Sequence, residues 1–316
     1  MQAILAVTIP FCALVLAGYL AGRQRVLPES AIPGLNAYVL YFALPCMLFR
    51  FGMNTPVLEL LNPFVLMVYV ACALLVVALT IAISRRSGVD PKNAAFGALV
   101  AAFPNTGFMG VPLLVALLGA PAAGPVICSV LADLFVTSSL CIALAQAHEA
   151  AAHGPRTAAL RAVRGALSNP LPWAIALGAA ASITQLRLPG PLDAIVRMLA
   201  DSATPVALFT IGTVLWRAGQ HAHTRTPVQH YLPVALIKLL VHPALVWAVG
   251  TAAQHLGAPL SGFQLTVLVL AAALPSASNV SLLAERYGAD NGRIARIIMS
   301  STVLAFGSFT ALAWWM

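Results

Sequence analysis

Long apolar stretches fill almost the whole chain and leave little sequence between them. Each is close to the 20 or so residues that a helix needs to cross the hydrocarbon core of a bilayer. Of the 316 residues, 60% are hydrophobic and 8% are charged, whereas about a quarter are charged in soluble domains. The sequence therefore predicts an all-α polytopic membrane protein with ten transmembrane helices. We place them near 3–21, 31–49, 62–83, 94–118, 122–147, 170–186, 202–216, 228–253, 263–284 and 294–316.

The basic residues predict how the chain is oriented. Of the 17 Lys and Arg residues, 13 follow the first, third, fifth, seventh and ninth stretches, and three lie on the opposite side. Because positively charged loops stay in the cytoplasm, we expect an integral protein of the cell inner (plasma) membrane with both termini extracytoplasmic. The net charge of +8 is spread through short loops, so the lipid bilayer is an expected partner and nucleic acid is not.

Signals for metal, cofactor or catalytic chemistry are weak. The five cysteines lie in apolar stretches without a CxxC pair, which predicts neither a disulfide framework nor a zinc site. The histidines of HEAAAH at 148–153 are five residues apart, whereas a zinc-protease helix needs four, so we expect a polar linker there, as for HAH at 221–223. An intramembrane enzyme would depend on Thr137, Ser138 and Ser139, and no histidine is placed to complete a triad. We expect no metal, no cofactor and no enzyme activity.

Two of the apolar stretches are interrupted by the same motif. AAFPNTGFMGVPLLVALLGA at 101–120 and AAALPSASNVSLLAERYGAD at 271–290 both place Ala-Ala-X-Pro in mid-span, then small and polar residues, then an apolar half-helix that ends at Gly-Ala. Five helices separate the two motifs, and this odd number predicts two inverted five-helix repeats. The first repeat would cover 1–150 and the second 169–316, with a short cytoplasmic linker at 151–168.

The interruptions predict a binding site. Proline removes a backbone donor, and irregular backbone at membrane depth is tolerated only when protein buries it or when it lines a wet cavity. A kinked structural helix would explain one mid-span proline, but two symmetry-related breaks at Pro104 and Pro275, each followed by a polar cluster, favour crossing half-helices whose N-termini face an anion. The predicted substrate-binding residues are Asn105, Thr106, Gly107, Ser276, Ser278 and Asn279.

Four sequence motifs also carry a resemblance to a known family. PNTGFMGVPLL at 104–114, PSASNVSLLAERYGAD at 275–290, TIPFCALVLAGYLAGR at 8–23 and YFALPCMLF at 41–49 resemble the auxin efflux carrier family. They are most similar to its compact bacterial branch, which includes malonate and malate carriers. The resemblance runs the whole length of the chain. The plant carriers have a long central loop that is short here, so auxin is not the expected substrate.

The resemblance implies more than the residues do by themselves. It implies a fold related to sodium/proton antiporters and bile acid symporters, in which helices 4 and 9 are broken and cross. It also implies an elevator mechanism, with transport-bundle helices 3–5 and 8–10 moving past scaffold helices 1, 2, 6 and 7, usually in a homodimer. Matched to the crossover motifs of the family, Pro104, Asn105, Pro275 and Asn279 become the substrate-site residues.

Charged residues inside the membrane give a second candidate site. Asp133 lies deep in the fifth stretch, and its obvious cationic counterpart is Lys238 in the eighth, with His242 one helical turn further along. A charge at mid-bilayer costs roughly 2.5 to 3.5 kcal/mol on insertion scales and is a functional hypothesis by default. One hypothesis is a pair whose protonation couples transport to protons, or a Lys238 that faces the substrate carboxylate. The alternative is a permanent structural ion pair.

The sequence therefore favours a secondary transporter for a small organic anion, with a dicarboxylate such as malonate suggested by the family resemblance. Within transport, the alternatives are an auxin-like or other monocarboxylate carrier and a sodium-coupled organic anion symporter. A membrane receptor without turnover is the alternative outside transport. Because two carboxylates need more compensation than one, the number of cationic groups at the site would discriminate between the first two.

Overall fold

The computed structural model describes residues 2–56, 60, 62–146, 169–220 and 226–316. The predicted linker at 151–168 and the histidine motifs at 148–153 and 221–223 lie outside these residues. Within the described part every named element is helical. The first half contains α1 (Gln2–Arg23), α2 (Ala31–Tyr38), η1 (Val39–Ala43), α3 (Leu44–Asn54), α5 (Pro63–Arg86), α6 (Pro91–Ala102), η2 (Thr106–Gly110), α7 (Val111–Leu118), η3 (Ala120–Ala122), α8 (Ala123–Ala132), η4 (Asp133–Thr137) and α9 (Ser138–Ala145).

The second half is also helical in its described residues. It contains α12 (Pro170–Ile183), α13 (Gly190–Gln220), α14 (Val228–Leu236), η5 (Ile237–Val241), α15 (His242–His255), α16 (Gly262–Ala272), α17 (Val280–Arg286) and α18 (Asn291–Trp315). The elements η1, η4 and η5 are single wide turns of π-helix inside longer helices, and η2 is such a turn at the start of the half-helix that continues as α7. Such turns often mark functional positions.

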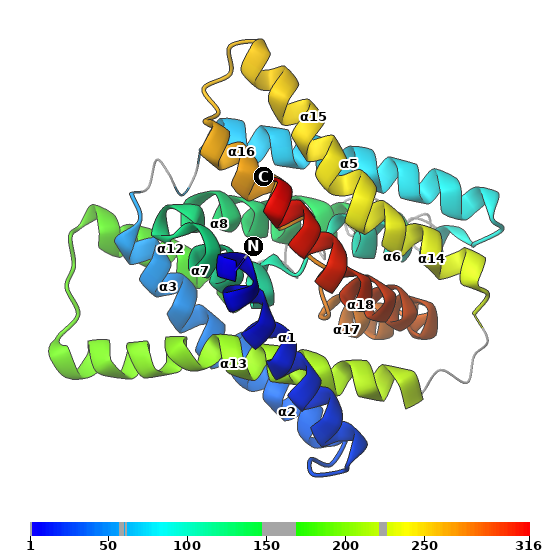
Figure 1. Cartoon of the computed structure of the whole chain (residues 1–316), viewed down its shortest axis with the longest axis horizontal. Coiled ribbons are helices and arrows are strands. Elements are labelled where there is room, and N and C mark those ends of the chain that lie inside the picture. The colour runs from blue at the N-terminus through cyan, green and yellow to red at the C-terminus, as the bar shows by residue number, and fades with distance from the viewer. Residues whose placement is uncertain (1, 57–59, 61, 147–168, 221–225) are drawn as a thin grey trace.

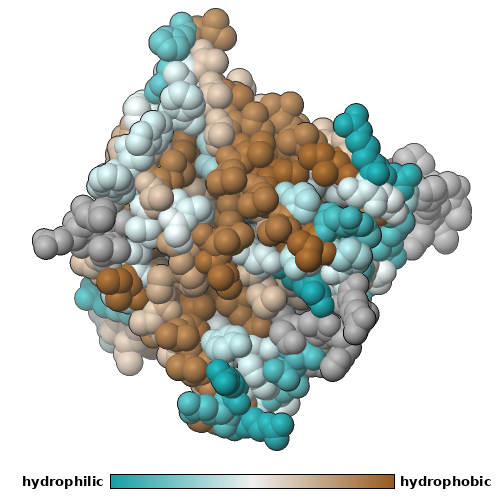
Figure 2. All heavy atoms as spheres, turned by 45° about the vertical axis from the view of Figure 1, so that its right-hand side comes forward, coloured by the Kyte–Doolittle hydropathy of each residue, from teal (hydrophilic) through white to brown (hydrophobic). Residues whose placement is uncertain are grey.

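Seven helical spans among the described residues are long and apolar enough to cross a membrane: Ala6–Arg23, Ala31–Asn54, Pro63–Arg86, Ala120–Ala145, Gly190–Arg217, Val228–His255 and Asn291–Trp315. Three shorter apolar helices, Thr106–Leu118, Pro170–Ile183 and Gly262–Ala272, lie between them. The described part of the chain is therefore all helical, with the apolar spans of a polytopic membrane protein. Figure 2 shows one face on which brown apolar residues form a broad surface with teal residues toward its edges, as expected where lipid surrounds the protein.

The seventh predicted stretch begins too late in the sequence. It was expected to begin near residue 202, whereas α13 begins at Gly190. The added turns contain charged residues, which a hydropathy window rejects. Two contacts hold these charges in the helix: Asp193 lies 3.6 Å from Arg197 one turn later, and Asp201 lies 3.6 Å from Arg50 of α3. The helix therefore continues past the apolar window.

The helices pack in two groups (Figure 1). In one group, α1 packs along α13, and α3 packs along both α12 and α13. In the other, α5 packs on α6 and α15, α16 packs on α15 and α8, and α14 packs on α18. The two groups meet where α18 contacts α1 and α13.

Glycines allow the closest crossings of the first group. A Cβ on Gly18 of α1 would overlap the carbonyl oxygen of Phe209 in α13, and a Cβ on Gly178 of α12 would lie 2.5 Å from the carbonyl oxygen of Phe49 in α3. The backbones of these helix pairs are therefore in direct contact, which small residues make possible inside membranes.

Candidate functional site

Both predicted interruptions are true breaks in the helices. The first helix ends at Ala102 and resumes at Thr106, and the second ends at Ala272 and resumes at Val280. The backbone between them is not helical, with Phe103 extended at φ −103° and ψ 94°. Pro104 and Pro275 lie inside these segments, where the missing N–H of proline cannot support a helical hydrogen bond.

The backbone groups of the two breaks form hydrogen bonds with each other. Asn105 N donates to the carbonyl oxygen of Pro275 at 2.8 Å, and Ala277 N donates to the carbonyl oxygen of Phe103 at 3.0 Å. This forms a short antiparallel bridge between Pro104 and Ser276. Because backbone groups left unpaired at membrane depth are costly, the bridge explains how two interruptions are tolerated where one alone would be unfavourable.

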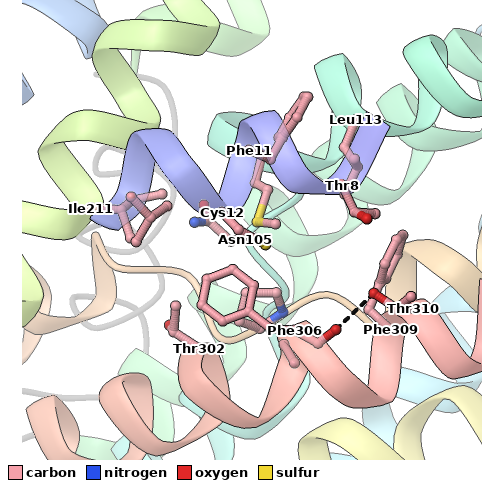
Figure 3. A pocket seen from close by; sticks show the side chains of 14 residues that line it. Thr8, Phe11, Cys12, Asn105, Leu113, Ile211, Thr302, Phe306, Phe309 and Thr310 are labelled. Carbon is pink, nitrogen blue, oxygen red and sulfur yellow. Dashed lines mark hydrogen bonds between the residues drawn. The ribbon is translucent and has the colours of Figure 1, made fainter. Parts of the chain in front are cut away.

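A cavity lies beside this crossing. Its walls come from both breaks and from α1, α13 and α18. Figure 3 shows the side chain of Asn105 between α1 and α18, close to Cys12 and Phe306. The lining contains aromatic, aliphatic and neutral polar side chains and no charged one. The lining residues are Thr8, Phe11, Cys12, Val15, Asn105, Met109, Leu113, Ile211, Pro275, Thr302, Ala305, Phe306, Phe309 and Thr310.

Of the predicted substrate-site residues, the cavity brings together only Asn105 and Pro275. Thr106 is fully buried, with its hydroxyl 3.5 Å from the carbonyl oxygen of Pro104. Gly107 is buried, and a Cβ there would meet nothing within 4 Å. The predicted polar cluster is thus divided between the cavity wall and the interior of the crossing.

The second break contains buried polar atoms that form no hydrogen bond with the described residues. The Ser276 hydroxyl and the Asn279 side-chain oxygen are buried and have no hydrogen-bond partner among the described residues. Ser278 is nearly buried, and its carbonyl oxygen accepts a hydrogen bond from the Ser281 hydroxyl at 2.9 Å. The backbone N–H of Ser276 donates to the Ser301 hydroxyl at 3.2 Å, which joins this break to α18. Unpaired buried polar atoms are uncommon in proteins and call for an explanation.

The buried charges lie in a separate cluster. Asp133, in η4, is fully buried and accepts hydrogen bonds from the Tyr69 hydroxyl at 3.0 Å and the Thr137 hydroxyl at 3.2 Å. Lys238, in η5, is also fully buried; its ammonium donates to the Ala272 carbonyl oxygen at 2.5 Å and lies 3.2 Å from His242 Nδ1. Within the described residues no ion pair joins Asp133 to Lys238, and no three metal-ligating side chains gather into a metal site.

Two further contacts place this cluster next to the breaks. The rings of Tyr69 and His242 have centroids 5.9 Å apart, so the acid and the base belong to one buried region. Ala272 is the last residue of α16 before the second break. Lys238 therefore contacts the end of the broken helix from inside the bundle, away from the residues that line the cavity.

Two residues with important contacts were missed by the sequence analysis. Tyr69 was read as part of an apolar stretch, although a single tyrosine in mid-span was a usable signal, since a buried hydroxyl needs a partner. Arg293 was counted among loop charges, yet it is only 2% exposed. Its position in the first turn of a helix, where the dipole disfavours a cation, was the available signal.

Comparisons with known proteins show the family of this chain. The model of a family described as "Membrane transport protein" matches residues 3–314. A "Putative malonate transporter" of Rhizobium meliloti is 32% identical over 99% of this chain and 95% of its own length. "Uncharacterized transporter YfdV" of Escherichia coli K12 is 24% identical over 88% and 87%, and an "Uncharacterized transporter" of Methanothermobacter thermautotrophicus is 25% identical over 93% and 92%. The match of nearly the whole chain shows that this protein is a membrane transport protein of the auxin efflux carrier family.

Proposed function

We propose that this transporter carries a small organic anion, in the first instance a dicarboxylate such as malonate, through the crossing of its two broken helices. The observation that carries the proposal is the cavity beside the bridge between Pro104 and Ser276, with the Asn105 side chain in its wall. Half-helix N-termini at such breaks present unpaired N–H groups and a positive dipole end to an anion. The carboxylate would accept hydrogen bonds from Asn105 and from the N-terminus of η2, and Thr106, Gly107, Ser276, Ser278 and Asn279 would shape the site as the carrier moves.

The choice of malonate rests on the name of the relative from Rhizobium meliloti. The uncharged cavity lining favours a second candidate, a monocarboxylate, because one carboxylate needs less compensation than two. Lys238 would supply the additional charge for a dicarboxylate only if its ammonium left the Ala272 carbonyl oxygen and turned toward the cavity.

We further propose ten membrane crossings in two inverted repeats. The seven long spans and three shorter apolar helices occupy the ten expected places in the chain, with the half-helices α6 and α17 completing the broken pair. The close crossings support the repeat: Gly18 on Gly212 pairs α1 with α13, and Gly178 on Gly52 pairs α12 with α3. Gly178 and Gly212 follow Gly18 and Gly52, respectively, by the same 160 residues.

The packing supports an elevator mechanism. The scaffold would be α1, α2, α3, α12 and α13, and the transport bundle would contain the remaining helices, including both breaks. The cavity lies between α1 of the scaffold and α18 of the bundle, so relative movement of the two groups would carry a bound anion. We propose a homodimer in the inner membrane with extracytoplasmic termini, from the family resemblance and the distribution of basic residues.

We propose that the buried cluster couples transport to protons through Asp133, Lys238 and His242, with a purely structural cluster as the alternative. Replacing Asp133 by Asn keeps the shape of the side chain and removes its titration. Proton coupling predicts that the variant loses the pH dependence of transport, and an unchanged pH profile would exclude Asp133 as the coupling group. Transport that stops when sodium is omitted at constant pH would favour the sodium-coupled alternative.

The first experiment is counterflow of labelled malonate into proteoliposomes preloaded with unlabelled malonate. We expect label accumulation with the wild type and a loss of at least about tenfold in Asn105→Ala, since hydrogen bonds to charged groups contribute about 1.5 to 3 kcal/mol. Asn54→Ala is the matched control, because in the described structure the Asn54 amide donates only to the Arg50 carbonyl oxygen and Asn54 does not line the cavity.

Each outcome is informative. Equal counterflow by Asn105→Ala and wild type would exclude the proposed anion-binding site at the first break. No accumulation by folded wild type would remove malonate, and monocarboxylates would be tested next in the same assay. Binding without any exchange would favour a receptor.

A further inference from the structure

Arg293 lies buried at one end of the helical bundle, outside the cavity and the Asp133 cluster. Its guanidinium donates to the His230 carbonyl oxygen at 2.8 Å, to the Asn93 carbonyl oxygen at 2.7 Å and to the Ser84 hydroxyl at 3.2 Å. These three partners belong to α14, α6 and α5, while Arg293 itself is in the first turn of α18. One side chain therefore joins the ends of four helices.

The neighbouring helix leaves room for this guanidinium. A Cβ on Gly97 of α6 would lie 2.7 Å from Arg293 Nη1 and 2.9 Å from Nη2, closer than atoms can pack. Gly97 is fully enclosed among buried residues of α6. The absence of a side chain at Gly97 is therefore what allows Arg293 to reach the Asn93 carbonyl oxygen.

A second set of contacts joins the same two helix ends. Asp290 N donates to the Asn93 side-chain oxygen at 2.7 Å, and the Asp290 carboxylate accepts from Arg293 N at 2.9 Å. The Asp90 carboxylate in turn accepts from the Asn93 backbone N–H at 3.0 Å and from its side-chain amide at 2.7 Å. The starts of α6 and α18 are thus bonded to each other through Asn93.

Burying the Arg293 guanidinium at the start of α18 has an energetic cost. A buried cation must replace its hydration with fixed partners, and a cation in the first turn of a helix is opposed by the helix dipole. The corresponding segment of the first half, 122–125 at the start of α8, is Ala-Ala-Gly-Pro and carries no charge. The described residues at the start of α8 therefore contain no counterpart of the Arg293 side chain.

We propose that Arg293 is a positioning residue that fastens α5, α6, α14 and α18 into one body, so that both breaks are carried together. The inference rests on the proposed transport function. Along α6, Asn93 is ten residues from the break at Phe103, about 15 Å at the helical rise. Arg293 therefore acts on the movement of the site and leaves anion binding to the residues of the breaks.

Hydrogen exchange of the full-length protein in lipid nanodiscs tests the fastening without requiring a known substrate. In Arg293→Ala we expect exchange to rise at least about tenfold together at 80–86, 91–97 and 228–234, since the lost hydrogen bonds involve a charged group. Arg293→Lys should restore little, because an ammonium lacks the planar fork that reaches three partners. A rise confined to the start of α18 would overturn the proposal.

Gly97 provides a double-mutant cycle. Made in the wild-type background, Gly97→Ala should increase hydrogen exchange as Arg293→Ala does. Made in the Arg293→Ala background, it should add little, because the added methyl group then has no guanidinium to displace. The control is Gly307→Ala in α18, where a Cβ meets nothing within 4 Å. An equal effect of Gly97→Ala in both backgrounds would contradict the assigned contact.

Counterflow separates positioning from stability alone. Below the unfolding temperature of each variant, we expect Arg293→Ala to lower the maximal rate at least about tenfold with little change in KM. An unchanged maximal rate, despite increased exchange, would reduce Arg293 to a structural role. If the wild type carries no malonate, the hydrogen-exchange data still test whether Arg293 holds the four helices together. Only the proposed substrate is then excluded.

Discussion

At the scale of single residues, the buried charges are held mainly by neutral groups. Asp133 accepts from two hydroxyls, Lys238 contacts a carbonyl oxygen and an imidazole, and Arg293 donates to two carbonyl oxygens and a hydroxyl. Hydrogen bonds to neutral dipoles can replace hydration without fixing a charge pair. Within the described residues, Asp133 and Lys238 therefore have hydrogen-bond partners other than each other.

Asp90 gives a prediction for stability at this scale. Partial burial acts to raise the pKa of the Asp90 carboxyl, but hydrogen bonds from the Asn93 backbone and side chain outweigh it and hold the pKa below its ordinary value. The carboxylate thus stabilises the folded state above the unfolded pKa of about 3.9, and this contribution is lost as pH falls through the lower folded pKa. Asp90→Ala should cost about 1 kcal/mol near pH 7.

The measurement is the apparent unfolding temperature in detergent from pH 7 down to pH 3. The difference between wild type and Asp90→Ala should be largest at neutral pH and should shrink below about pH 4. Asp90→Asn serves as the control, since asparagine also caps helices well. A difference that stays constant with pH would show that the charge of Asp90 is not involved.

At the scale of helices, the architecture depends on local departures from regular helix. Proline and small residues break α6 from α7 and α16 from α17, and the broken ends bond to each other. Elsewhere glycine permits backbone contact between helices, as at Gly18 and Gly178. The two breaks were visible in the sequence as motifs, but the residues that each break contacts were not.

The glycine crossings can be tested directly. Gly18→Ala and Gly178→Ala should each destabilise the protein by about 1 to 3 kcal/mol, because the added methyl would press on a carbonyl oxygen of the facing helix. Gly34→Ala is the matched control, since a Cβ there meets nothing within 4 Å. Thermal unfolding of the purified protein measures the effect. Alanine tolerated at Gly18 as well as at Gly34 would contradict the close α1–α13 crossing.

At the scale of the whole molecule, the cavity lies between elements that belong to different packing groups. Cys12 of α1 lies in its wall opposite α18, where Figure 3 shows it near Asn105. A reagent attached to Cys12 would fill the space through which we propose the anion moves.

Thiol labelling therefore tests the placement of the cavity. N-ethylmaleimide should inhibit malonate counterflow by wild type, and malonate should slow the labelling. Cys12→Ser should remove most of the inhibition, whereas Cys46→Ser should not, because Cys46 is also partly buried but lies outside the cavity lining. Equal inhibition of wild type and Cys12→Ser would place the sensitive thiol elsewhere.

Sequence patterns alone predicted the class of protein, the family and the two helix breaks. Hydropathy over about 20 residues reports whether a segment prefers lipid, and proline acts on its own turn of helix, so both signals are local. The predicted start of the seventh stretch was wrong, because Asp193 and Asp201 are held by contacts that a hydropathy window does not include.

The contacts between polar residues of different helices followed from the packing of the folded chain. This packing placed Asn105 in the cavity wall and Thr106 inside the crossing, joined Asp133 to Tyr69 rather than to Lys238, and buried Arg293 against Gly97. These outcomes depend on the rotation of each helix about its axis and on its neighbours, since a rotation of one residue, about 100°, turns a side chain from one partner to another. Spacing along one chain segment does not contain that information.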